Sequence, residues 1–162
     1  MTIFIGYQGI GKSTLTKLHD NFVDFESGNF YVDGVRPSDW YKPYCNCALD
    51  LSSQGLNVFT ASHQVVRDRF KELNKNENIY VVCPSLELKD LWIEKLHKRY
   101  VDSQLDKDYR AWKNAEDRYT ENIKELHQPF PSIEITSMDY DLYNLLEPYL
   151  SHKQGVLFSL YE

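Results

Sequence analysis

The stretch that decides the fold reads Gly6-Tyr7-Gln8-Gly9-Ile10-Gly11-Lys12-Ser13-Thr14. It contains the pattern Gly-x4-Gly-Lys-Ser, directly after the apolar run Thr2-Ile3-Phe4-Ile5 and directly before a segment with helical periodicity. Glycines allow the backbone to curl around an anion, and successive N–H groups together with a helix start supply partial positive charge. The stretch therefore predicts a phosphate cradle between a buried strand and a helix.

This context is the one that a P-loop requires, so we predict that the chain binds ATP and Mg²⁺. Lys12 is then the residue that reaches the β- and γ-phosphates, and Ser13 is a ligand of the metal. Thr14 either touches the α-phosphate or only opens the helix. The alternative is a glycine-rich turn that holds no ligand. The predicted nucleotide-binding residues are Gly6, Gln8, Gly9, Ile10, Gly11, Lys12, Ser13 and Thr14.

Size and composition favour a single domain, because 162 residues with 42% hydrophobic side chains suffice for one core. The formal net charge of -6 argues against an extended basic surface, so a long nucleic acid is an unlikely partner class. Three cysteines form neither a disulfide framework nor a zinc-finger pattern, which is typical of reduced thiols in the cytoplasm. We expect neither a signal peptide nor a membrane span, since apolar runs are too short.

Short apolar runs alternate with longer amphipathic segments along the chain, which predicts an α/β fold. Strands are expected at residues 2–5, 22–25, 57–61, 79–83 and 133–136, and helices at 12–19, 39–54, 64–74, 86–100 and 140–150. Alternation of this kind implies a three-layer αβα sandwich around a five-stranded parallel sheet. Ser38 or Asp39 is the expected start signal of the second helix, and Gly55 its stop signal.

A charged segment, residues 102–128, carries apolar side chains at three-to-four-residue spacing and predicts one more amphipathic helix. We expect this helix to be peripheral, because its apolar stripe is thin. Together with the preceding helix it forms a highly charged helical region, about residues 86–128, that carries several Lys and Arg side chains. Pro129 and Pro131 are expected to end it before the last strand.

Carboxylates follow the second predicted strand rather than the third. Motor and switch proteins usually place an Asp at the end of an apolar strand, but the strand at 57–61 runs into Ser62 and His63. Asp24 and Glu26 instead stand two residues apart, on the same side of an extended chain. The carboxyl ends of parallel strands face the ligand crevice, so this pair is a candidate for catalysis or metal binding. The alternative is a solvated strand end.

With these features the sequence resembles small P-loop phosphotransferases of the nucleoside monophosphate kinase and shikimate kinase-like group. It is also similar to small bacteriophage-encoded (deoxy)nucleotide kinases, which would place it in the host cytoplasm. By that resemblance Asp24 binds the acceptor or acts as a base, and Glu26 organises Mg²⁺ or its water. The chain lacks the Asp-Gly-x-Pro-Arg element that adenylate kinases carry after the third strand, which leaves the acceptor open.

The resemblance also implies an acceptor site and a lid. The acceptor residues would be Arg36, Tyr41, His63 and Arg67, because aromatic faces can stack a base and arginine can hold a phosphate, with Glu26 beside the acceptor as well as the metal. The lid would be the helical region at about 86–128, with Arg99 delivering a planar, permanently charged fork to the transferring phosphate. The alternative reading of these residues is core aromatics and solvated helix surface.

We therefore expect an ATP-dependent phosphotransferase with Lys12, Asp24 and Arg99 as catalytic residues and a nucleoside or deoxynucleoside monophosphate as acceptor. One alternative is a kinase of another small molecule or of a nucleic-acid end. Another is a regulatory protein that binds a nucleotide without turning it over. The chain has no Asn/Thr-Lys-x-Asp guanine signature, which argues against a GTPase switch.

Overall fold

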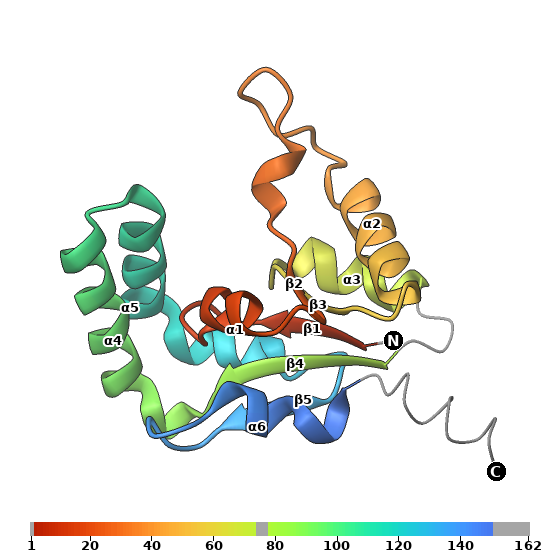
Figure 1. Cartoon of the computed structure of the whole chain (residues 1–162). Helices are drawn as coiled ribbons and strands as arrows, with labels where there is room; N and C mark the ends of the chain where they lie inside the picture. The colour runs from red at the N-terminus through yellow and green to blue at the C-terminus, as the bar shows by residue number, and fades with distance from the viewer. Residues whose placement is uncertain (1, 74–77, 151–162) are drawn as a thin grey trace, which may run out of the picture.

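The computed structural model describes residues 2–73 and 78–150. Five strands that all run parallel form a central sheet in the order β2-β3-β1-β4-β5 (Figure 1). The strands are β1 (Thr2–Gly6), β2 (Phe22–Asp24), β3 (Asn57–Thr60), β4 (Asn78–Pro84) and β5 (Ser132–Ile135). Every expected strand is present, so the predicted five-stranded parallel sheet is confirmed.

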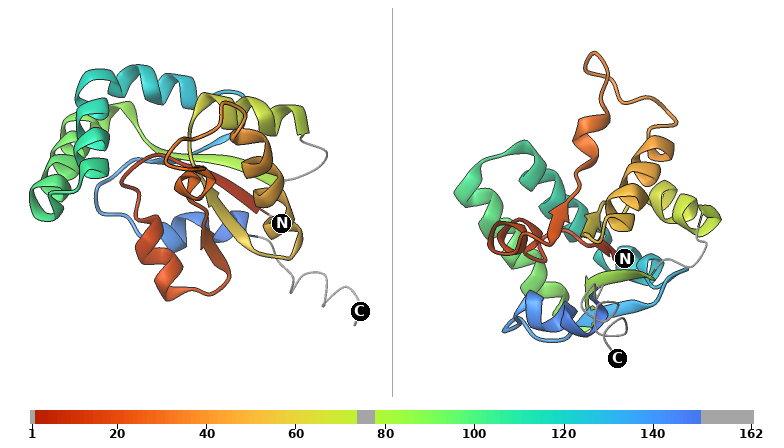
Figure 2. Two further views of the ribbon diagram at one scale, coloured as in Figure 1. Left: turned by 90° about the horizontal axis from the view of Figure 1, so that it is seen from above. Right: turned by 45° about the vertical axis from the view of Figure 1, so that its right-hand side comes forward.

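Helices cover both faces of this sheet. In the view from above, α1 and α6 lie on one side of the strands, and α3 with the second half of α5 lies on the other (Figure 2, left). The helices in the described residues are α1 (Lys12–Leu18), α2 (Tyr41–Ser53), α3 (Gln64–Leu73), α4 (Lys89–Ser103), α5 (Asp106–Leu126) and α6 (Leu142–Leu146). This arrangement agrees with the expected three layers. None of these helices is both long and apolar enough to cross a membrane.

Two helix predictions need correction. Neither Ser38 nor Asp39 caps α2, which begins at Tyr41 after Trp40 without a side-chain cap, although Gly55 follows its end with φ 88° as expected. The helix expected at 140–150 is shorter, because a 3-10 turn with Pro148 follows α6 and proline has no N–H for the helical ladder. The last residue of the helix expected at 64–74 lies outside the described residues.

The expectation that the helix at 102–128 is peripheral is wrong for the second half of α5, whose apolar side chains are buried. A kink interrupts α5 at Arg118, whose backbone leaves the helical region with φ −138° and ψ 21°. Before the kink, α5 pairs with α4 in a helical hairpin that stands at one side of the molecule (Figure 1). After it, Tyr119 and Ile123 are buried in the core next to β4. The apolar side chains of α5 thus pack against α4 before the kink and against the sheet after it.

The central position of β1 decides where a ligand can bind. Its side chains are buried throughout, as expected for a parallel strand covered on both faces. The chain stays on one side of β1 as far as β3 and crosses to the other side with β4. Crevices for ligands open at such a reversal, beyond the carboxyl end of the strand. That end of β1 is Gly6, where the cradle sequence begins.

Candidate phosphate-binding site

The loop between β1 and α1 requires glycine at two positions. Gly9 and Gly11 have φ values of 85° and 101°, in the left-handed region that side chains with a Cβ rarely adopt. A Cβ on Gly9 would also lie 2.8 Å from Cδ2 of Leu96 in α4. The loop therefore needs these glycines for its own conformation and for close contact with α4.

Two carbonyls of the loop are held from outside. The indole Nε1 of Trp92 in α4 donates to the carbonyl of Gln8 at 3.0 Å. The hydroxyl of Tyr140, after β5, donates to the carbonyl of Ile10 at 2.7 Å. Carbonyls fixed in this way cannot turn toward an anion, which their oxygens would repel. The sequence around Trp92 and Tyr140 carries no signal for this role, because both contacts join segments that are remote along the chain.

One cavity of about 380 Å³ gathers most of the predicted donor-side residues. It is lined by the loop from Gln8 to Ser13 and by Asp24, Glu26 and Arg99. Thr14 lines a neighbouring cavity of about 460 Å³ that shares Ile10 and Gly11 with the first. Three elements that are distant in sequence, the loop, the end of β2 and α4, thus meet at one place.

The charges of this cavity are only partly compensated. Burial lowers the pKa of the Lys12 ammonium, and the carboxylates of Asp24 and Glu26 offset that effect only in part. Burial raises the pKa of the Asp24 carboxyl, against the opposing effect of Lys12. An ammonium that the protein solvates poorly is stabilised by a bound anion. The electrostatics therefore suit a phosphate group beside Lys12.

The residues present fit Mg²⁺ only together with a phosphate ligand. Ser13 and Glu26 both line the cavity and offer hard oxygen ligands. The described residues contain no group of three or more His, Cys, Asp or Glu side chains that could hold a metal ion by themselves. Mg²⁺ commonly takes one or two protein oxygens and completes its shell with phosphates and water. Ser13 and Glu26 are the side chains that would hold it here.

A second cavity, of about 520 Å³, adjoins the first and shares Gln8, Lys107 and Ala111 with it. It lies between the end of β1, the start of α3 and the length of α5, and its lining includes His63 and Arg67 from the sequence prediction. The predicted acceptor site did not include the polar side chains that α5 contributes. These are Lys107, Arg110, Asn114, Asn122 and Glu125.

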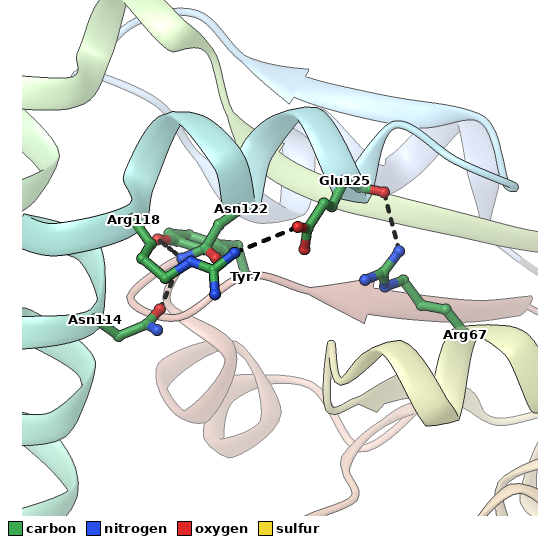
Figure 3. A network of polar contacts seen from close by, with 6 residues as sticks. All are labelled: Tyr7, Arg67, Asn114, Arg118, Asn122 and Glu125. Carbon is green, nitrogen blue, oxygen red and sulfur yellow. Dashed lines mark hydrogen bonds and ion pairs between the residues drawn. The ribbon is translucent and has the colours of Figure 1, made fainter.

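Polar contacts along α5 organise this second cavity (Figure 3). Asn122 donates to Oδ1 of Asn114 at 2.7 Å and so spans the kink in α5, and it reaches the Tyr7 hydroxyl at 3.5 Å. Gln8 donates to the carbonyl of Ala111 at 3.0 Å. Tyr7 and Gln8 of the cradle loop are therefore both hydrogen-bonded to α5.

The Arg67 guanidinium binds three backbone carbonyls. Arg67 is only 7% exposed, and its Nη1 donates to the carbonyls of Glu125 at 2.9 Å and Gln128 at 3.2 Å. Its Nε donates to the carbonyl of Ser62 at 3.2 Å. The role as an acceptor-phosphate ligand stays a prediction, and it would have to use the remaining Nη2 group.

Arg36 and Tyr41 do not line either of these two cavities. Arg36 instead lies 4.1 Å from the centroid of the Trp40 ring, and Tyr41 contacts the same ring edge to face. His63 meets Trp40 as well, at 5.5 Å, and burial followed by the charge of Arg36 lowers its imidazole pKa. Trp40 thus connects Arg36, Tyr41 and His63, whereas the Arg67 guanidinium binds the end of α5.

Tyr44 joins the ends of two strands beside the first cavity. Its hydroxyl donates to the carbonyl of Phe25 at 2.6 Å and accepts from the amide of Ala61 at 2.8 Å. Phe25 follows Asp24, and Ala61 follows β3. This fully buried side chain in α2 therefore fixes the position of the acidic pair. Among the aromatics near residue 40, Tyr44 is a core residue, as the alternative reading expected.

A scan of the chain against models of known protein families finds no match, and a search of curated proteins finds none either.

Proposed function

We propose that the protein is an ATP-dependent phosphotransferase of the P-loop kinase type, whose acceptor is a nucleoside or deoxynucleoside monophosphate. The observation that carries the proposal is the junction of two cavities at Gln8 and Lys107. The first holds Lys12, Asp24 and the glycine loop, and the second is lined by amides and cations. A donor and an acceptor bound in the two cavities would meet beside Lys12.

The donor would lie with its phosphates in the loop. Backbone N–H groups and the start of α1 attract the phosphate oxygens, and Lys12 neutralises the β- and γ-phosphates. The neighbouring cavity of about 460 Å³ shares Ile10 and Gly11 with the cradle and has room for the base and ribose. Its wall includes Tyr140 and Tyr143, whose rings are suited to stacking.

The acceptor would lie in the second cavity with its phosphate toward the first. Lys107 lines both cavities and Arg110 lines the second, so two cations can attract a monophosphate. The side-chain amides of Asn114 and Asn122 offer donors and acceptors that can recognise a base. Arg110 pairs with Asp106 at 3.5 Å, but both side chains are largely exposed, so the guanidinium can exchange this weak contact for an acceptor phosphate.

Transfer breaks the bond between the γ-phosphorus and its bridging oxygen, forms a bond to an acceptor oxygen and releases ADP. Lys12 and Arg99 stabilise the charge on the transferring group, and Asp24 orients the acceptor. Mg²⁺, when bound at Ser13 and Glu26, supplies further charge neutralisation on the β- and γ-phosphates. Positioning and electrostatics supply most of the rate enhancement in this chemistry.

An acceptor screen tests the proposal. ATP, Mg²⁺ and a panel of ribo- and deoxyribonucleoside monophosphates, nucleosides and hydroxy acids are incubated with the protein, and ADP release is measured with and without acceptor. We expect ADP release that depends on one class of monophosphate and is abolished in Lys12→Ala with the fold intact. Acceptor-independent release, or none, would favour a nucleotide-binding regulatory protein, and release with a nucleoside or hydroxy acid would favour another small-molecule kinase.

A further inference from the structure

An ion pair at the tip of the helical hairpin joins the first cavity to the turn between α4 and α5. Nε of Arg99 lies 3.0 Å from Oδ1 of Asp108. The two partners differ in environment, because the Arg99 side chain is 48% exposed and the Asp108 side chain only 6%. Both line the cavity that holds Lys12. The pair therefore consists of a fixed, buried carboxylate and an arginine that reaches the cavity.

Asp108 is held in place by the turn itself. Its second oxygen, Oδ2, accepts from the hydroxyl of Ser103 at 2.5 Å, and that hydroxyl accepts from the amide of Leu105 at 3.1 Å. Asp108 also stands in the first turn of α5, where the helix dipole favours a negative charge. Exposed ion pairs contribute little because their partners are free to move. This carboxylate is not free to move.

The geometry leaves most of the guanidinium available. Arg99 has five N–H donors, and the ion pair uses the one on Nε, so four remain on the two Nη atoms. A planar fork of this kind can bind a carboxylate along one edge and a phosphate along another. A lysine ammonium has no second edge of that kind. An unpaired carboxylate at this wall would in addition repel the phosphates.

We propose that Asp108 is a positioning residue that aims Arg99 at the transferring phosphoryl group. This inference rests on the proposed phosphotransferase function and deepens it. Asp108 touches neither substrate in this account and acts only through Arg99. Loss of the Asp108 carboxylate leaves Arg99 charged but free to adopt other orientations. The loss should therefore lower the rate of transfer more than the affinity for ATP.

Steady-state kinetics of a double-mutant cycle test the proposal. In Asp108→Asn we expect kcat to fall roughly 10- to 100-fold with KM for ATP changed by less than about 3-fold, the loss typical of a misplaced catalytic group. Arg99→Ala should lose at least as much, and Arg99→Ala combined with Asp108→Asn should lose no more than Arg99→Ala alone. Glu116→Gln removes the same charge from an ion pair of α5 outside the cavities, and it should keep wild-type kinetics.

Melting temperatures separate positioning from folding. Asp108→Glu keeps the charge and displaces the guanidinium, so it should melt near wild type and still lose kcat. Additive losses in the cycle, or full activity of Asp108→Asn beside an impaired Arg99→Ala, would overturn the inference alone. A wild-type protein that binds ATP–Mg²⁺ but transfers to none of the tested acceptors would overturn the proposed function, and the inference with it.

Discussion

At the scale of single residues, the cradle depends on side chains that bind its carbonyls rather than its ligand. Trp92 and Tyr140 each donate to one carbonyl of the loop, and the hydroxyl of Tyr140 in turn accepts from Nζ of Lys95 at 3.0 Å. Lys95 also lies 4.3 Å from the centroid of the Trp92 ring. These contacts form a brace that holds the loop before any nucleotide binds, which reduces the ordering that binding requires.

Removal of one hydroxyl from this brace should weaken nucleotide binding without disrupting the fold. Tyr140→Phe leaves the ring in place and frees the carbonyl of Ile10. A single hydrogen bond contributes about 0.5–1.5 kcal/mol, so we expect the Kd for ATP–Mg²⁺ to rise roughly 2- to 10-fold by calorimetry. Tyr149→Phe, at an exposed ring remote from the loop, is the control. An unchanged Kd with a lower melting temperature would show that the hydroxyl only stabilises the fold.

At the scale of elements, the kink at Arg118 lets α5 line both cavities and also pack on the sheet. Its first half contributes Lys107 and Ala111 to both cavities, and its second half packs on the sheet. Local periodicity predicted the helix but not the break, since nothing in the sequence near Arg118 resembles a proline or glycine kink. The same limit applies to Asn114 and Asn122. Their pairing across the kink depends on a backbone departure that only the folded chain defines.

Arg67 should act mainly as a tie between α3 and the end of α5. Arg67→Gln removes three hydrogen bonds to backbone carbonyls, and hydrogen bonds from charged groups contribute about 1.5–3 kcal/mol. We expect the free energy of unfolding in urea to fall by roughly 2–3 kcal/mol. Arg69→Gln, which breaks a pair with the largely exposed Glu72, should cost less than about 1 kcal/mol.

Equal losses in the two variants would contradict this assignment of Arg67. The kinetics then separate the sequence prediction from the structural role. A rise in KM for the acceptor beyond that caused by lost stability would support Arg67 as an acceptor ligand, because that contact exists only with substrate bound.

At the scale of the whole molecule, the strand order explains what the sequence could and could not predict. The cradle and the Asp24–Glu26 pair have local signals, since a strand, a glycine loop and a strand end are each readable from neighbouring residues. The position of β3 between β2 and β1 has no local signal. That order places Asp24 and Ala61 beside the loop. Asp108 and Trp92 were missed for the same reason, because their partners come from other elements.

Nucleotide binding should stabilise the entire chain, because the cradle lies at the centre of the sheet. A ligand present at 100 times its Kd adds about 2.7 kcal/mol, which corresponds to a rise in Tm of roughly 5–11 °C for a chain of 162 residues. We expect ATP–Mg²⁺ to raise the Tm of the wild type by that amount in a thermal-shift assay. Chelation of Mg²⁺ should reduce the shift.

Lys12→Met provides the matched comparison. Burial lowers the pKa of Lys12, so its charged form carries a cost in the folded state that is fully present below the folded pKa, falls as the pH rises past that pKa and is gone above the unfolded pKa. Methionine removes that cost but also removes the cation with the largest effect on the Asp24 carboxylate. The two effects oppose each other, and we expect the variant without nucleotide to melt within a few degrees of wild type. With ATP–Mg²⁺ its Tm should not rise. A shift as large as that of the wild type would contradict the placement of the phosphates at Lys12, and a shift in neither protein would contradict nucleotide binding itself.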